Sequence, residues 1–191
     1  MLYAFGFDKV GIVLGDIYFV DPNPHKGQEG AEHGVRVELR VFDRPPLPGT
    51  IYSAQPIEIT RPIWRADLLE SVAGDPGSYN RTHHHPEFRD WDPTSRVFLR
   101  ELSADPLGWL GGKLADMDGI LAEAGFPPDT AGPADAADLK AAADEIVAVT
   151  SRLLGKIRAG QAGTRPADAP LSDAAPPGTG TSQILIRSGW L

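Results

Sequence analysis

The alternation of apolar and charged residues in GVRVELRVF, residues 34–42, constrains the fold of this chain more than any other feature. Successive side chains of a β-strand point to opposite faces. One face of this strand therefore has only aliphatic residues, Val35, Val37, Leu39 and Val41. The other face has three charged residues, Arg36, Glu38 and Arg40, between Gly34 and Phe42. Such strands are typical of antiparallel sheets that have one face against a core.

Further strands are predicted before residue 80. β-Branched and aromatic residues dominate segments 2–7, 10–20 and 50–60. Segment 61–72, RPIWRADLLESV, is ambiguous between a helix and a strand, but its place after several strands favours another antiparallel strand. Arg65 and Asp67 would then share a face with two apolar residues, Ile63 and Leu69. Burying such charges is costly, so the pattern predicts either a buried ion pair or a polar pocket.

The chain becomes helical after residue 103. Asp105 and Pro106 are typical of a helix start, and leucines follow at helical spacing as far as Gly125. A second helix is predicted from about Ala134 to Ala159. We therefore expect an α+β fold, with a curved antiparallel sheet of roughly five or six strands backed by two C-terminal helices.

Composition divides the chain into three parts. Residues 1–160 form the predicted single domain, and residues 161–180 form a linker of mainly Ala, Pro, Gly and Asp. Residues 181–191 are an apolar tail that ends in Trp190 and Leu191. We expect this tail to dock as a strand on a sheet edge of its own chain or of a second copy, which would form a homodimer.

Charge and the lack of cysteine exclude several classes of function. The 18 basic and 26 acidic residues give a net charge of −8, which disfavours nucleic acids and anionic lipid surfaces as partners. Without cysteine, the chain has no disulfide, zinc–thiolate site or thiol nucleophile. No apolar run approaches the ~18 residues needed to cross a bilayer, and no signal-peptide pattern is present. We expect a cytoplasmic protein that binds neither nucleic acid nor membrane.

The candidate site is RTHHHPEFRDW, residues 81–91. In an extended segment His83 and His85 share one face, and His84 points to the other. Two imidazoles on one strand face can each offer a neutral nitrogen to a divalent metal ion. We therefore predict His83 and His85 as ligands of zinc, manganese or iron.

The remaining ligands would come from nearby carboxylates or from another loop. His33 is a predicted third metal ligand, because residues 22–33 form a loop that we expect to lie near residues 81–91 and to become ordered on ligand binding. Glu87 and Asp90 are the predicted acid–base residues, each within reach of a histidine along the chain. The alternative is a polar loop whose histidines only form hydrogen bonds with carboxylates or the backbone.

Residues 77–90 resemble the opening of the first cupin motif, with Gly77, five residues, the histidines, and Asp90 at the acidic position. The resemblance implies a metal site inside a small β-barrel. It covers about 14 residues. The chain then departs from the family, because no histidine follows His85 and helices are predicted where barrel strands would continue. We therefore retain the His-x-His geometry and predict no cupin barrel.

Two functions fit these observations. The first is a metal-supported enzyme or binder that acts on a small-molecule ligand through the His-x-His site. The second is a non-catalytic interaction or oligomeric protein held together by the apolar tail. Metal content distinguishes the two.

Deleting residues 181–191 is expected to lower the melting temperature or to convert a dimer to a monomer. The reason is that burying each large apolar side chain of the tail contributes ~1.5–3 kcal/mol before ordering costs. Thermal unfolding and sedimentation measure the two effects. A truncated protein with unchanged stability and unchanged mass would contradict both forms of docking.

Overall fold

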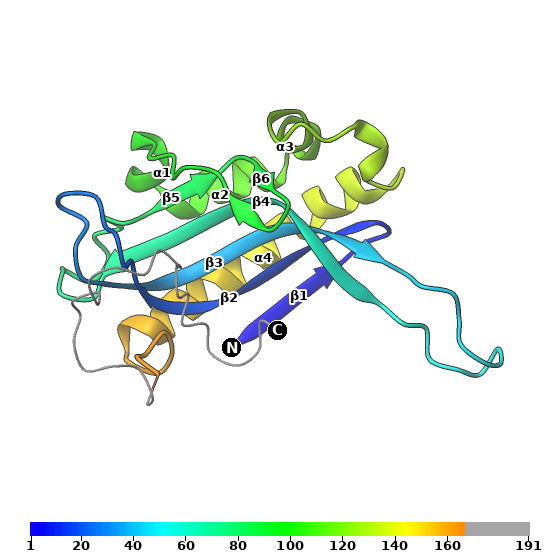
Figure 1. Cartoon of the computed structure of the whole chain (residues 1–191), viewed down its shortest axis with the longest axis horizontal. Helices are drawn as coiled ribbons and strands as arrows, with labels where there is room; N and C mark the ends of the chain where they lie inside the picture. Colours follow the sequence, from blue (N-terminus) through cyan, green and yellow to red (C-terminus); the bar gives the residue numbers. More distant parts are fainter. Residues whose placement is uncertain (167–191) are drawn as a thin grey trace.

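A five-stranded antiparallel sheet forms the centre of the computed structural model, which describes residues 1–166 (Figure 1). The strands are neighbours in chain order: β1 Leu2–Gly6, β2 Val10–Val20, β3 Ala31–Asp43, β4 Glu58–Ser71 and β5 His83–His85. A small separate hairpin consists of β6 Phe88–Arg89 and β7 Asp92–Pro93. The helices are α1 Arg100–Ala104, α2 Pro106–Leu114, α3 Met117–Glu123, the 3-10 helix η1 Pro128–Thr130 and α4 Asp135–Arg158.

The helices cover one face of the sheet, and the core lies between the two layers. Helix α4 crosses behind β2 and β3 in Figure 1. The aliphatic face predicted for β3 is buried in this core with Trp64, Leu68 and the inward side chains of α2 and α4. The predicted α+β class, with an antiparallel sheet backed by C-terminal helices, is confirmed.

β4 is a strand along its whole length, so the strand interpretation of segment 61–72 is correct. Its pairing with β3 shifts register beside Arg40, which lies opposite Pro62. A proline has no N–H to donate to the ladder, so an irregularity at this point is expected. Most of segment 50–60, which we predicted as a strand, instead connects β3 to β4, and only residues 58–60 belong to β4.

The first predicted helix begins as expected but is divided. Asp105 caps α2, and its side chain accepts a hydrogen bond from the Gly108 N–H at 3.0 Å. Asp116 repeats the arrangement with the Gly119 N–H at 3.0 Å, so a new helix begins there. A Cβ on either glycine would collide with the capping carboxylate. These two glycines therefore serve helix starts, and the sequence D-x-x-G predicts both.

The first residues of the predicted linker pack against the domain. Ala162 is buried in the core, and the Gly163 N–H donates to the Asp16 carboxylate at 2.7 Å. Residues 167–191, which contain the predicted tail, lie outside the described residues. Within residues 1–166, no helix is long and apolar enough to span a bilayer.

One buried carboxylate joins the start of α4 to the β1–β2 turn. Asp135 is fully buried and accepts hydrogen bonds from the backbone N–H groups of Asp8, Lys9 and Gly132 at 2.7, 3.0 and 2.7 Å. These three backbone N–H groups have no acceptor in a helix or in the sheet, and the carboxylate supplies one for each of them. The carboxylate thereby fixes the position of α4 relative to the edge of the sheet.

The Asp135→Asn variant is expected to lose about 2 kcal/mol or more of unfolding free energy, because an amide cannot accept all three bonds. Asp138→Asn is the matched control, since Asp138 is an exposed acid in the same helical turn. Urea denaturation measures both variants. Equal losses would mean that Asp135 acts only through the helix dipole.

Candidate metal centre

The face of the sheet turned away from the helices is lined by charged residues that are nevertheless buried. Arg36 and Glu38 on β3 lie opposite Asp67 and Arg65 on β4 in the strand register. All four are at most 7% exposed. The charge order on one strand is therefore the complement of the order on its neighbour.

These residues form two cross-strand ion pairs. Arg36 binds Asp67 through two nitrogens, with Nε–Oδ1 at 2.8 Å and Nη2–Oδ2 at 3.1 Å. Arg65 binds Glu38 with Nε–Oε1 at 2.7 Å. Arg65 and Asp67 are both in buried ion pairs, but each pairs with a residue of β3 and not with the other. Buried charges in such pairs are costly to separate.

β5 brings two histidines onto the same face, beside Asp67. His83 and His85 lie opposite Asp67 and Arg65, and their Nε2 atoms are 3.5 and 3.7 Å from Asp67 Oδ2. Their rings are 4.9 Å apart and nearly perpendicular. His84 points to the helix side, where its ring is 5.2 Å from that of Trp109. The predicted division of the three histidines between two faces is therefore confirmed.

Asp67, His83 and His85 form a group that could hold a metal ion. One ligand atom from each residue lies within 4.8 Å of the other two, and all three residues are buried. We refer to these residues as the Asp-His-His group. An imidazole nitrogen and a carboxylate oxygen are ordinary ligands of zinc and of iron.

Backbone carbonyls orient both rings of the group. His83 Nδ1 is 2.7 Å from the Arg81 carbonyl oxygen, and His85 Nδ1 is 2.6 Å from the Thr94 carbonyl oxygen. Since a carbonyl only accepts, each Nδ1 must carry the proton and donate it. The Nε2 atom of a neutral ring then has a lone pair, which points toward Asp67. Histidines that bind metals have this arrangement, with the second nitrogen held by a hydrogen bond.

The protonation states favour a ligand role. Burial lowers the pKa of His85 to about 4, against the opposing effect of Asp67. Burial alone would raise the pKa of Asp67, but Arg36, His83 and Arg65 together hold it well below its usual value. At neutral pH the group therefore has an ionised carboxylate and a neutral His85, the forms in which both residues bind metal.

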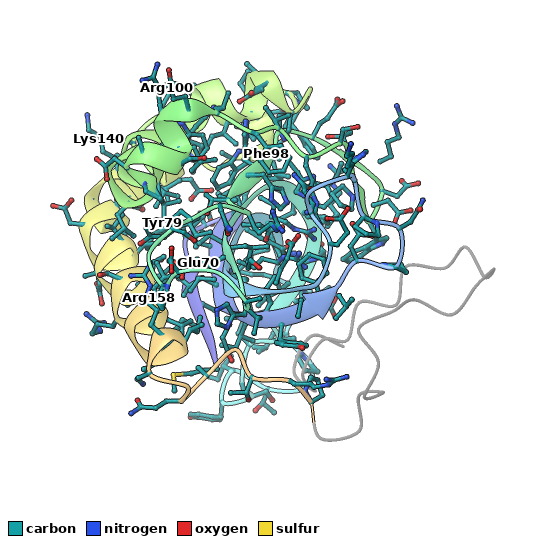
Figure 2. The ribbon with its side chains drawn as sticks, turned by 90° about the vertical axis from the view of Figure 1, so that its left-hand side faces the viewer. Glu70, Tyr79, Phe98, Arg100, Lys140 and Arg158 are labelled. Carbon is teal, nitrogen blue, oxygen red and sulfur yellow. The ribbon has the colours of Figure 1, made fainter. Side chains whose placement is uncertain are left out.

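Aromatic side chains enclose this face. Phe88 of the β6–β7 hairpin lies over the guanidinium of Arg65, 4.9 Å from the ring centre. Trp91 of the same hairpin lies over Arg40 at 5.4 Å. The ring of Phe98, which Figure 2 labels, is 5.4 Å from that of His83. The hairpin and Phe98 thus cover part of the charged face.

His33, predicted as the third ligand, is not part of the Asp-His-His group. It lies opposite Glu70 on the helix side of the sheet. The strand register places it about 17 Å along β4 from His85. Glu70 binds Arg158 of α4 there, and Tyr79 lies beside them (Figure 2). Burial lowers the pKa of His33, against the opposing effect of Glu70.

Glu87 and Asp90, predicted as acid–base residues, are exposed in and beside the β6–β7 hairpin. Among residues 1–166, no hydrogen bond or ion pair joins either carboxylate to the Asp-His-His group. The loop after β2 does lie beside segment 81–91, because Arg81 Nη1 donates to the Gly27 carbonyl at 2.9 Å. The predicted proximity is therefore correct, although His33 itself belongs to β3 and faces the other way.

Asp67 is the member of the group that sequence reasoning did not assign to the site. The sequence does contain a pattern that indicates its position. The motif R-x-E on β3 matches R-x-D on β4 in charge only in the antiparallel register that places Arg36 opposite Asp67. With that register, the carboxylate falls on the face opposite the core. The next strand would then place alternate histidines beside it.

Comparisons of the chain with protein-family models, curated proteins and solved structures gave no match. The function is therefore inferred from the residues of the site.

The Arg36→Met variant is expected to lose about 3–5 kcal/mol of unfolding free energy in metal-free protein, because it leaves the Asp67 carboxylate buried without its partner. The double variant Arg36→Met/Asp67→Leu should recover most of this loss. Arg44→Met is the matched control, because the Arg44–Asp8 pair is half-exposed, and should change stability by less than about 0.5 kcal/mol. If the double variant is as unstable as Arg36→Met, the cost does not arise from an isolated carboxylate. Urea denaturation measures each value.

Proposed function

We propose that the Asp-His-His group binds a divalent transition-metal ion, and that the ion supports the binding or conversion of a small molecule. One observation supports this most strongly. Two imidazole Nε2 atoms converge on one carboxylate oxygen, while each Nδ1 is already used by a backbone carbonyl.

The distances suit such an ion. Two ligand atoms bonded at about 2.0 Å to a tetrahedral ion are separated by about 3.3 Å. The Nε2–Oδ2 separations of 3.5 and 3.7 Å are close to this value. Where a ring is neutral, its Nε2 atom and the carboxylate oxygen are both acceptors, so they repel one another unless a cation or a proton lies between them.

The donor set favours zinc or iron(II). Two imidazoles and one carboxylate are found in catalytic zinc sites and in mononuclear iron(II) sites, whereas manganese prefers more oxygen ligands. Three protein ligands also leave coordination positions for water or a substrate. A metal bound in this way would act as a Lewis acid.

The surrounding residues would have positioning roles. Arg36 holds the Asp67 carboxylate through two hydrogen bonds, and the Arg81 and Thr94 carbonyls fix the two rings. Such contacts typically change metal affinity by about 10–100-fold. The acid–base roles of Glu87 and Asp90 remain predictions, since both side chains are exposed.

The second function inferred from the sequence, docking through residues 181–191, depends on residues outside the described part of the chain. The Asp-His-His group lies entirely within it. The metal site is therefore the function that the described residues support best.

Element analysis of protein purified without a His-tag is expected to find zinc or iron in equimolar amount, either as purified or after incubation with each metal and dialysis. His83→Ala and His85→Ala should each abolish binding, because each removes a ligand, and Asp67→Asn should weaken it by about tenfold or more.

His84→Ala is the matched control, because its ring lies on the other face of the same strand, and should retain the metal. His33→Ala should also retain it, since His33 lies opposite Glu70. Circular dichroism checks that each variant is folded. Absence of metal from the parent after supply of zinc, iron and manganese would show that the proposal is wrong, and equal loss in His84→Ala would show that the ligand assignment is wrong.

A further inference from the structure

The charged face beside the Asp-His-His group has an excess of positive charge. Its central part contains three arginines, Arg36, Arg40 and Arg65, and two carboxylates, Glu38 and Asp67. The chain as a whole has a net charge of −8, so the excess is local. All five side chains are at least 85% buried, and water therefore screens them poorly.

Arg40 is the residue whose charge is least compensated. Asp67 is bound by Arg36, and Glu38 Oε1 is bound by Arg65. Among residues 1–166, the carboxylate oxygen paired with Arg40 is Glu38 Oε2, at 3.4 Å from its Nε. Neither of these two buried atoms makes a hydrogen bond within the described residues. A buried guanidinium N–H without an acceptor is costly, so an additional acceptor at this position would be stabilising.

A bound ion would increase the imbalance. Asp67 already accepts two hydrogen bonds from the guanidinium of Arg36, which compensates its charge. A divalent cation would therefore add positive charge to a face that already has an excess. An anionic ligand that reaches both the ion and the arginines would compensate this charge.

The β6–β7 hairpin covers this part of the face and could admit a ligand. It has two paired positions, Phe88–Pro93 and Arg89–Asp92, and Thr94 closes it with two hydrogen bonds to the Glu87 carbonyl. Its Trp91 is 59% exposed although the ring lies over Arg40. Such a short hairpin has few backbone hydrogen bonds to break, so local opening is inexpensive.

We propose that the ligand of this site is a small oxyanion, a carboxylate or a phosphate, bound between the metal ion and the guanidinium groups of Arg40 and Arg65. A planar guanidinium matches the two oxygens of either group. This inference rests on the proposed metal site, since the ion supplies one of the contacts.

The test is calorimetric titration of the zinc-loaded protein with inorganic phosphate and, separately, with malonate, after element analysis of each sample. The parent is expected to bind at least one of the two anions, and the tighter one identifies the chemistry. Arg40→Gln should weaken binding by about tenfold or more while retaining zinc, because it removes a charged donor. Arg40→Lys should retain part of the affinity, since it keeps the charge without the planar fork.

Arg100→Gln is the matched control, because Arg100 is an exposed arginine at the start of α1, labelled in Figure 2, and should bind as the parent does. Retained zinc without binding of either anion would overturn this inference and leave the metal site standing. Equal affinity in Arg40→Gln and the parent would also overturn it. Failure of the parent to retain zinc would be seen in the element analysis and would overturn both proposals.

Discussion

The buried ion pair between Arg36 and Asp67 is the interaction on which the charged face depends. Asp67 is almost completely buried, and its carboxylate is adjacent both to the guanidinium of Arg36 and to two imidazoles. Replacing a buried ion pair by apolar residues is often neutral or stabilising. Stability alone therefore does not explain why these charges occupy the centre of a sheet. The proposed metal ion, which needs a fixed, ionised carboxylate, would explain it.

One face of the sheet packs on the core and the other contains the candidate site, and the short strand β5 contributes side chains to both. His84 faces the core and contacts Trp109, which anchors the strand from the helix side. This contact fixes the rotation of β5, so His83 and His85 must both face Asp67. The strand is only three residues long, and backbone hydrogen bonds between His84 and Val97 and those of Thr82 with Leu69 also hold it in place. The apolar core thus determines the geometry of the polar site.

The sequence predicts those parts of the fold that depend on local patterns. The alternation in residues 34–42 correctly predicts a strand with one face against helices, and Asp105 with Pro106 predicts the start of α2. The break before α3 was missed because leucine spacing continues through it, although Asp116 and Gly119 repeat the capping pattern. Asp67 was missed for another reason. Its role depends on register between strands, which no single segment specifies.

The site also depends on the β6–β7 hairpin, whose structure is hard to predict from local sequence patterns. The Thr94 carbonyl that orients His85 comes directly after the β6–β7 hairpin, and the same hairpin places Phe88 over Arg65. Opening of the hairpin would therefore expose the arginines. It would also break the hydrogen bond that His85 Nδ1 donates to the Thr94 carbonyl. A bound ion would hold the ring from the opposite nitrogen and would limit this change. The conformation of the hairpin and the order of the Asp-His-His group are consequently coupled through the hydrogen bond between His85 and Thr94.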